Sequence, residues 1–247
     1  MLTPSELDRY GRQIMMPGFG EAGQEKLKAA KVFIGGAGGL GCPISIYLTN
    51  AGIGTIRIVD HDKIELSNLN RQVLHWPEDV GRRKIDSASE KLGRMNPEMK
   101  LEALCETIDE SNVFQLTEGF DVIVDAMDNI KTRYLLNEAA IKHGIPFMHG
   151  AIYGLEGRAM TVVPGKSACL ACVYRGIPPK VRFPVLGVTP AVIGCIQATE
   201  VIKYLTGIGE LLIDRIIIYD GLNMKFTEVN IHRNLECTCC GNIPARS

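Results

Sequence analysis

A glycine-rich turn is the first feature of this 247-residue chain with the residue types and spacing that chemistry requires. Gly36, Gly38 and Gly41 form the pattern G-x-G-x-x-G, and Gly39 adds a further glycine. Glycines let the backbone approach a phosphate, and the N-terminus of the following helix favours negative charge. Asp60 ends the next predicted strand, where a carboxylate can accept hydrogen bonds from ribose hydroxyls. These residues predict a nucleotide site, and at this point ATP and NAD both fit.

A second group of charged residues favours a triphosphate. Arg71 and Lys84 supply positive charge for phosphate oxygens, although each taken singly is a typical surface charge. Asp128 stands between a predicted strand and a predicted helix, so it either caps that helix or holds a magnesium ion. Asn129 could cap the helix instead and leave Asp128 free. Together with the glycine turn and Asp60, these residues indicate an ATP site rather than a dinucleotide site.

Two cysteine pairs form the third group. Cys169-x-x-Cys172 and Cys237-x-x-Cys240 supply four thiolates, which suits a closed tetrahedral zinc site; the alternative is two unrelated pairs of thiols. Such a zinc ion is structural rather than catalytic, because no ligand position stays open. Cys239 lies inside the second pair and could replace a neighbour as ligand. The remaining cysteines are interpreted as small core residues, namely Cys42, Cys105 and Cys195.

Composition narrows the class of protein. Hydrophobic residues make up 46% and charged residues 22%, which is enough for a sizeable core. A net charge of -1 argues against broad nucleic-acid binding, which usually shows a basic excess. No apolar run approaches the roughly 20 residues of a membrane span, and the polar N-terminus is not a secretory signal. Eight cysteines then indicate reduced thiols or metal ligands, and we expect a cytoplasmic protein without membrane contact.

The elements that must position these residues alternate along the chain. Strands are predicted over residues 32–34, 55–60, 100–105, 120–126 and 145–151. Helices are predicted between them, up to about residue 51 and over residues 82–95, 110–119 and 131–143. This alternation is typical of a Rossmann-like α/β fold with a doubly wound, mostly parallel sheet. Ligands bind at the carboxyl ends of such strands, where the glycine turn, Asp60 and Asp128 all fall.

The flanking segments complete a single predicted unit over residues 1–247. Thr3 and Glu6 form a capping-box pattern before a helix through residue 14, and a second helix covers residues 21–30. A strand over 159–163, a helix from Thr189 to about residue 205, and strands over 214–219 and 225–230 indicate an antiparallel C-terminal extension. The predicted parts are N-terminal helices (1–30), a nucleotide-binding half (31–157) and a zinc-bearing half (158–247).

The ordered set of motifs resembles the ThiF/MoeB/HesA family, the prokaryotic relatives of ubiquitin-activating enzymes. The set comprises the glycine turn, Asp60-x-Asp62, the run Ser-Asn-Leu-Asn-Arg-Gln that ends at Gln72, Lys84, Asp128-Asn129 and the two cysteine pairs. The resemblance extends from about residue 7 to residue 241. It implies an adenylyltransferase that uses ATP to activate the C-terminal glycine of a ubiquitin-like β-grasp sulfur-carrier protein ending in Gly-Gly. The resemblance also implies that pyrophosphate is released and that the activated carrier serves thiamine, molybdopterin or tRNA-thiolation chemistry.

The resemblance also implies roles for individual residues. Asp60 resembles the ribose-binding aspartate, and Asp128 resembles the catalytic aspartate linked to Mg²⁺. Arg71 and Lys84 resemble catalytic residues around the triphosphate. Arg12 resembles an arginine that reaches the ATP site of a partner subunit, which implies a homodimer. The implied nucleotide-binding set is Gly36, Gly38, Gly39, Gly41, Asp60, Asp62, Asn68, Arg71, Gln72, Lys84, Asp128 and Asn129.

The sequence differs from the family at one loop, and several alternative functions stay open. Some family members carry a cysteine in the loop after the first zinc pair, whereas residues 173–187 contain none here, and Phe183 stands near the expected place. We therefore expect the enzyme to stop at the adenylate. The basic segment 175–182 either guides the carrier or is a solvated loop. The alternative functions are adenylation of a small carboxylic acid or peptide, an NAD-dependent oxidoreductase, and a nucleotide-binding regulatory module.

Overall fold

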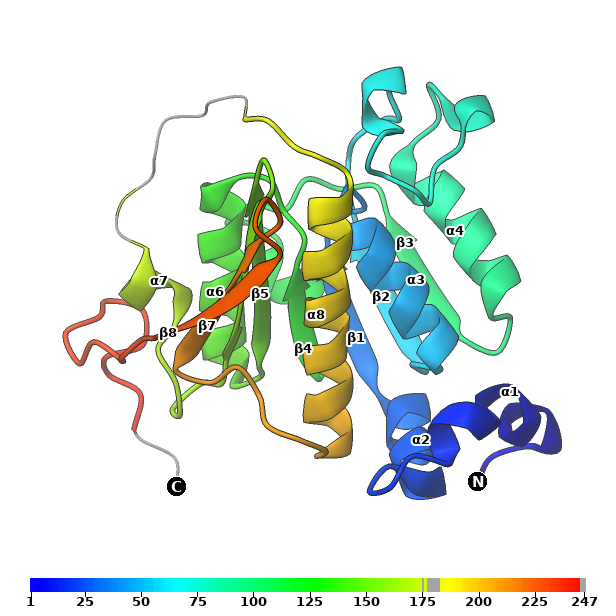
Figure 1. Ribbon diagram of the computed structural model, residues 1–247, viewed down its shortest axis with the longest axis horizontal. Helices are drawn as coiled ribbons and strands as arrows, with labels where there is room; N and C mark the ends of the chain where they lie inside the picture. Colours follow the sequence, from blue (N-terminus) through cyan, green and yellow to red (C-terminus); the bar gives the residue numbers. More distant parts are fainter. Residues whose placement is uncertain (175, 177–182, 245–247) are drawn as a thin grey trace.

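An eight-stranded sheet with the order β3-β2-β1-β4-β5-β6-β7-β8 forms the centre of the protein (Figure 1), whose computed structural model describes residues 1–174, 176 and 183–244. The parallel strands are β1 (Lys31–Gly35), β2 (Thr55–Val59), β3 (Lys100–Leu104), β4 (Val122–Asp125) and β5 (Phe147–Tyr153). The antiparallel strands are β6 (Glu156–Val162), β7 (Arg215–Asp220) and β8 (Lys225–Asn230). The predicted doubly wound sheet with an antiparallel extension is confirmed.

The order of the parallel strands reverses at β1. This strand pairs with β2 on one side and with β4 on the other, and Gly35 lies opposite both Val59 and Asp125. The carboxyl ends of three strands therefore meet at one place. In a sheet of this kind ligands bind in the crevice at the reversal point. The residues that follow β1, β2 and β4 therefore form the expected ligand site.

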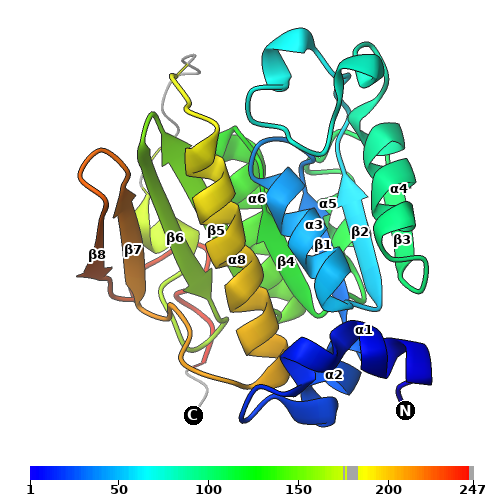
Figure 2. The same cartoon turned by 45° about the vertical axis from the view of Figure 1, so that its right-hand side comes forward.

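Helices cover both faces of the sheet (Figure 2). Side chains that alternate along β1 enter two separate cores, because successive strand residues point to opposite faces. Ile34 packs in the core beneath three helices, namely α3 (Gly41–Ala51), α4 (Lys84–Met95) and α8 (Val188–Thr206). Phe33 packs in the core beneath the helices of the other face, namely α5 (Val113–Thr117), α6 (Ile130–His143) and α7 (Leu170–Val173).

The N-terminal helices lie at the end of the sheet where the parallel strands begin. They are α1 (Pro4–Ile14) and α2 (Gly20–Ala29), and Figures 1 and 2 both place them away from the carboxyl ends of the strands. The predicted capping box is present, because Thr3 Oγ1 accepts the Glu6 amide and the Glu6 carboxylate accepts the Thr3 amide. Two 3₁₀ turns, η1 (Leu66–Asn68) and η2 (Pro77–Asp79), lie in the connection between β2 and α4.

Two helices are shorter than predicted. The helix predicted from residue 110 begins only at Val113, because the Asp109 carboxylate accepts the amide of Ser111 and holds a turn there. The helix predicted from residue 82 begins at Lys84, because Arg83 stays extended in a bridge to Lys63. Within the described residues, no helix is long and apolar enough to cross a membrane.

Candidate functional site

The glycine turn after β1 is shaped by two positions where a side chain cannot fit. Gly36 has a φ of +104°, and a Cβ there would lie 2.7 Å from the carbonyl oxygen of Ala126. A Cβ on Gly41 would lie 2.0 Å from the Gly36 oxygen. At Gly38 a Cβ would meet only Gln72 Nε2, at 3.7 Å, so this side of the turn is open. The turn thus exposes backbone to an approaching ligand at Gly38.

Charged groups from the end of β2 and the start of α4 border this turn. Asp60 Oδ2 accepts the Ala37 amide at 2.8 Å, and Oδ1 accepts the Asp62 amide at 2.8 Å. The buried ammonium of Lys84 lies 2.7 Å from Asp62 Oδ2 and 3.8 Å from Asp60 Oδ2. A fixed cation therefore stands beside the glycine turn, in the position where it can attract a phosphate.

A network of buried polar side chains contacts the glycine turn, and the sequence analysis did not predict it. His75 Nε2 lies 3.0 Å from the Ala37 carbonyl oxygen, and Nδ1 lies 3.0 Å from Ser87 Oγ. Because a carbonyl only accepts, Nε2 carries a proton. Ser87 also lies 3.0 Å from Asp79 Oδ2, which forms an ion pair with Lys91. The only sequence signal for this network is a serine on the apolar face of an amphipathic helix.

Burial and charge fix the protonation states in this network. Burial lowers the pKa of His75 below its ordinary value, so the ring is neutral at pH 7. Burial acts to raise the pKa of Asp79, but hydrogen bonds from Lys91, the Trp76 amide and Ser87 outweigh it and hold the pKa at about 2. Asp79 is therefore ionised at neutral pH.

The Asn-Leu-Asn-Arg-Gln stretch lies beside the open side of the turn. Asn68 accepts a backbone amide and closes η1, and Arg71 donates to the Ser67 carbonyl at 2.9 Å. Gln72 is buried beside Gly38, and its Oε1 has no hydrogen-bond partner in the described structure. Buried polar atoms rarely lack a hydrogen-bond partner, so this oxygen is a candidate to accept a hydrogen bond from a bound ligand.

Asp128 presents a free carboxylate at the same edge of the sheet. Asn129 caps α6, since its Oδ1 accepts the Thr132 amide at 2.9 Å, and this is the alternative that left Asp128 available. Asp128 is exposed and makes no hydrogen bond or ion pair with any other described residue. The preceding residue, Met127, lies against the glycine turn, 3.5 Å from a Cβ built on Gly36. A carboxylate without a protein partner suits a hard cation.

Arg12 does not join this group of residues. It is exposed on α1, at the opposite end of the sheet from the glycine turn, as Figures 1 and 2 show for the helix. The structure thus brings together the predicted residues of the glycine turn with Asp60, Asp62, Lys84 and Gln72. Arg71 packs on the turn, with Cγ 3.5 Å from a Cβ built on Gly39. Asp128 follows Ala126 and Met127, which are the residues of this segment that contact the glycine turn.

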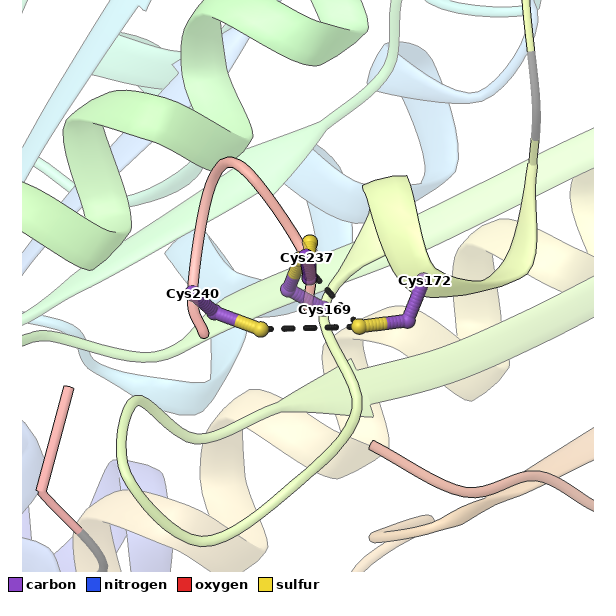
Figure 3. Close-up of side chains that lie close together, drawn as sticks. All are labelled: Cys169, Cys172, Cys237 and Cys240. Atoms are coloured by element: carbon purple, nitrogen blue, oxygen red, sulfur yellow. Dashed lines mark hydrogen bonds between the residues drawn. The ribbon is translucent and has the colours of Figure 1, made fainter. Parts of the chain in front are cut away.

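The two cysteine pairs form one cluster (Figure 3). The sulfur atoms lie 3.8 Å apart for Cys169 and Cys172, 3.7 Å for Cys169 and Cys237, and 3.5 Å for Cys172 and Cys240. Zn–S bonds of about 2.3 Å in a tetrahedron separate the sulfurs by about 3.8 Å. The cluster therefore fits zinc, and it joins α7 to a segment far away in the sequence. Cys239 is not one of the four mutually close sulfurs, although its side chain contacts Cys169; it accepts a hydrogen bond from Asn137 Nδ2 at 3.2 Å.

The other cysteines differ in burial. Cys42 is buried as predicted, and burial raises its pKa to about 12. Cys195 is half-buried on α8. The prediction that Cys105 is a core residue is wrong, because Cys105 follows the last residue of β3 and is exposed in the loop. Most of the predicted basic segment, Arg175 and residues 177–182, lies outside the described residues.

Known proteins resemble this chain over nearly its whole length. Residues 10–239 match the ThiF family. The SAMP-activating enzyme E1 of Haloferax volcanii is 44% identical over 246 residues, which cover 97% of this chain and 91% of that protein. The sulfur carrier protein adenylyltransferase of Thermus thermophilus is 40% identical over 255 residues, which cover 99% of this chain and 94% of that protein.

A solved structure shares both the fold and part of the sequence. The Escherichia coli protein MccB, in a crystal structure with MccA-N7isoASN, superposes with a TM-score of 0.86 at 26% identity. The match covers 96% of this chain and 75% of that chain. The family match and the two relatives, each at least 40% identical over nearly the whole chain, establish the family, and the solved structure agrees with the fold. The chain therefore belongs to the ThiF family.

Proposed function

We propose that this protein uses ATP to adenylate the C-terminal glycine carboxylate of a ubiquitin-like sulfur-carrier protein. The family and the names of its relatives support an adenylyltransferase of sulfur carriers. The observation that carries the proposal is the position of Asp128, whose carboxylate has no partner among the described residues, after β4 and so next to the strand that leads into the glycine turn, which has the Lys84 ammonium at its border. That combination suits a triphosphate with its metal and leaves no clear role for a nicotinamide.

The structure suggests how ATP is held as substrate. The open backbone at Gly38 and the unsatisfied Gln72 oxygen offer room and a polar contact. Asp60 stands at the carboxyl end of β2, where lone pairs not used by the Ala37 and Asp62 amides can accept ribose hydroxyls. Lys84 and Arg71 supply positive charge for the phosphates.

The reaction follows from charge. A peptide C-terminus is ionised at neutral pH, so its carboxylate oxygen can attack the α-phosphorus without a general base. The bond from the α-phosphorus to the bridging oxygen breaks, and pyrophosphate leaves with both bonding electrons. The obstacle is the approach of one anion to another, which Lys84, Arg71 and the N-terminus of α3 reduce. Mg²⁺ held by Asp128 would add positive charge to the phosphates and stabilise the leaving pyrophosphate.

Zinc in the cysteine cluster would be structural. All four positions of a tetrahedron are filled by protein sulfurs, so no position is left for a substrate. A backbone hydrogen bond also stabilises the cluster, since the Asn234 amide donates to Cys172 Sγ at 3.4 Å. Such a site needs reduced thiols, which agrees with a reducing compartment such as the cytoplasm.

A homodimer would give Arg12 a function. Arg12 is exposed in the last turn of α1, and this helix lies at the end of the sheet opposite the glycine turn, so Arg12 does not serve the site of its own chain. Met15 and Met16, which follow α1, expose 79% and 48% of their surfaces. Apolar side chains next to an exposed arginine are typical of an interface core and its hot spots. We therefore propose that α1 contacts a second copy of the chain and that Arg12 reaches the partner's phosphates.

ATP–pyrophosphate exchange tests the proposed function. The probes are the small β-grasp proteins ending in Gly-Gly from the source organism, each compared with a version that lacks the last glycine. Exchange that needs both a full-length carrier and Mg²⁺ supports the proposal. Exchange with small carboxylic acids and with no carrier would replace it by small-acid adenylation. NADH turnover without exchange would replace it by a dehydrogenase, and ATP binding without exchange by a regulatory module.

Adenylation of a peptide is the second candidate function. Several matching structures contain MccB together with MccA, one of them as MccA-N7isoASN. The chemistry at phosphorus would be the same, and only the acyl donor would differ. Short peptides with a free C-terminus, tested in the same exchange assay, distinguish the two donors. A carrier preferred over every peptide at equal concentration favours the first candidate.

We also propose that the reaction of this chain ends at the acyl adenylate. The loop over residues 173–187 contains no cysteine, and Cys195 is half-buried within α8. Burial raises the pKa of Cys195, which makes its thiolate scarce at neutral pH. Incubation with ATP and a carrier should give no covalent adduct in non-reducing gels or mass spectra. A thioester or acyl disulfide between the two proteins would contradict this proposal.

A further inference from the structure

Several polar contacts hold the backbone turn that leads to Asp128. Asp125, at the end of β4, is fully buried, and its Oδ1 accepts the Met127 amide at 3.0 Å. The Asp125 carbonyl accepts Gln197 Nε2 from α8 at 2.7 Å. The Ala126 amide donates to Gly35 in β1 at 2.9 Å. Asp128 follows directly, and its own carboxylate contacts no other described residue.

Two cationic or potentially cationic side chains complete this turn. His149 on β5 lies 2.7 Å from Asp125 Oδ2 through Nδ1. Arg133 on α6 lies 3.6 Å from the same oxygen and donates to the Met127 carbonyl through Nε at 3.1 Å and Nη2 at 2.6 Å. The turn is therefore fixed at the side chain of Asp125 and at both the amide and the carbonyl of Met127.

The imidazole of His149 makes no hydrogen bond to any described residue other than Asp125. Its Nε2 is buried and has no hydrogen-bond partner in the described structure. Burial lowers the pKa of His149, although the hydrogen bond to Asp125 opposes this, so the ring is neutral at pH 7. The Asp125 carboxylate is then balanced mainly by Arg133. Buried polar clusters of this kind add little stability compared with apolar packing, so a role in positioning accounts for the arrangement better than a role in folding.

We propose that His149 and Arg133 are positioning residues that hold the turn of residues 125–128 so that the Asp128 carboxylate meets the metal of bound ATP. The inference rests on the proposed function, because it takes Asp128 as the metal ligand. His149 acts through Asp125, and Arg133 acts through the Met127 carbonyl. Neither side chain needs to touch the substrate, the metal or the reacting atoms.

The test measures metal binding rather than turnover. Mg²⁺ is titrated calorimetrically into protein saturated with a non-hydrolysable ATP analogue. His149→Leu should weaken Mg²⁺ binding about 10-fold, the usual effect of losing a partner that orients a metal ligand. His149→Asn should restore binding to within about 3-fold, because its amide can donate to Asp125 from the place of Nδ1. Affinity for the analogue without metal should stay unchanged in both variants.

His143→Leu is the matched control. His143 is the last residue of α6 and so lies at the opposite end of that helix from the turn; its Nε2 is 3.1 Å from the Phe114 carbonyl oxygen and 3.1 Å from Thr117 Oγ1. This variant removes an imidazole that is half-buried rather than buried and that makes no contact with the turn of residues 125–128, so it should leave Mg²⁺ affinity as in the wild type. Equal weakening in His143→Leu and His149→Leu would overturn the proposal, since the effect would then reflect general loosening.

Arg133→Met gives a second route to the same answer. It removes both hydrogen bonds to the Met127 carbonyl and should weaken Mg²⁺ binding by a similar factor even where His149→Leu does not fold. Wild-type Mg²⁺ affinity in folded Arg133→Met and His149→Leu would overturn the inference. Asp128→Ala distinguishes failure of the positioning role from failure of the proposed function. If Asp128→Ala itself leaves Mg²⁺ affinity unchanged, the metal assignment fails; if it weakens binding and the other two variants do not, only the positioning role fails.

Discussion

His75 Nε2 lies 3.0 Å from the carbonyl oxygen of Ala37, the residue that follows Gly36 in the glycine turn. The amide of the same residue donates to Asp60 at 2.8 Å. The peptide groups on both sides of Ala37 are thus held by side chains from two other segments. A turn fixed in this way has little conformational freedom left to lose when a phosphate binds, which favours affinity.

The first prediction concerns this contact. His75→Leu should raise the KM for ATP about 10-fold and change kcat much less, because the loss of one hydrogen bond costs about 1.4 kcal/mol in binding. Initial rates of carrier-dependent pyrophosphate exchange, measured over a range of ATP concentrations, provide the test. His143→Leu should keep the wild-type KM. An unchanged KM in folded His75→Leu would show that the turn holds its shape without the imidazole.

The second prediction concerns Asp128. Asp128→Ala should reduce carrier-dependent exchange by at least about 100-fold, because it removes the carboxylate that would hold the metal at the developing charge. Thermal unfolding should be unaffected, since Asp128 is exposed and has no partner among the described residues. Glu118→Ala removes another exposed carboxylate, beyond α5, and should leave exchange intact. Near-normal exchange in Asp128→Ala would mean that the metal ligand lies elsewhere.

The third prediction concerns the cysteine cluster. Elemental analysis of the purified protein should find about one zinc ion per chain, held by four thiolates. Cys172→Ala should lose the zinc and lower the free energy of unfolding by several kcal/mol, because metal binding is coupled to folding. Cys105→Ala removes an exposed cysteine outside the cluster and should retain both zinc and stability. Metal-free wild-type protein of full stability would rule out the zinc site.

The fourth prediction concerns acid stability. The pKa of Asp79 is about 2 in the folded protein against 3.8 for the free side chain. A carboxylate whose folded pKa is depressed stabilises the fold above its unfolded pKa and loses that contribution as the pH falls through the folded value. The ion pair with Lys91 should therefore stabilise the protein fully above about pH 4 and progressively less towards pH 2.

Asp79→Asn tests this contribution. It leaves Lys91 buried without its partner and should lower the unfolding free energy at pH 7 by about 3 kcal/mol. Denaturant titrations of the variant and the wild type at several pH values should show this difference shrinking between about pH 4 and pH 2, as Asp79 of the wild type becomes protonated. A difference that stays constant over this range would contradict the assigned pKa.

Local pattern and residue type were enough to determine the class of fold and most of the candidate site. Apolar runs such as that of β1 read as buried strands because both faces of a parallel sheet are covered. Glycines at positions 36 and 41 are required by contacts within a few residues or between adjacent strands. Two cysteine pairs with the spacing C-x-x-C are typical of a zinc site. Their meeting in one cluster was therefore predictable, although 64 residues separate them.

Only the tertiary structure showed what holds these residues in place. His75, Asp79 and Ser87 come from a loop and a helix, and nothing in their spacing indicates that they support the glycine turn. Asp125 and His149 meet because β4 and β5 are neighbours in the sheet. The exposure of Cys105 likewise depends on where β3 ends. Sequence patterns report local periodicity, whereas contacts between buried polar groups depend on the register of strands and helices that are distant in the chain.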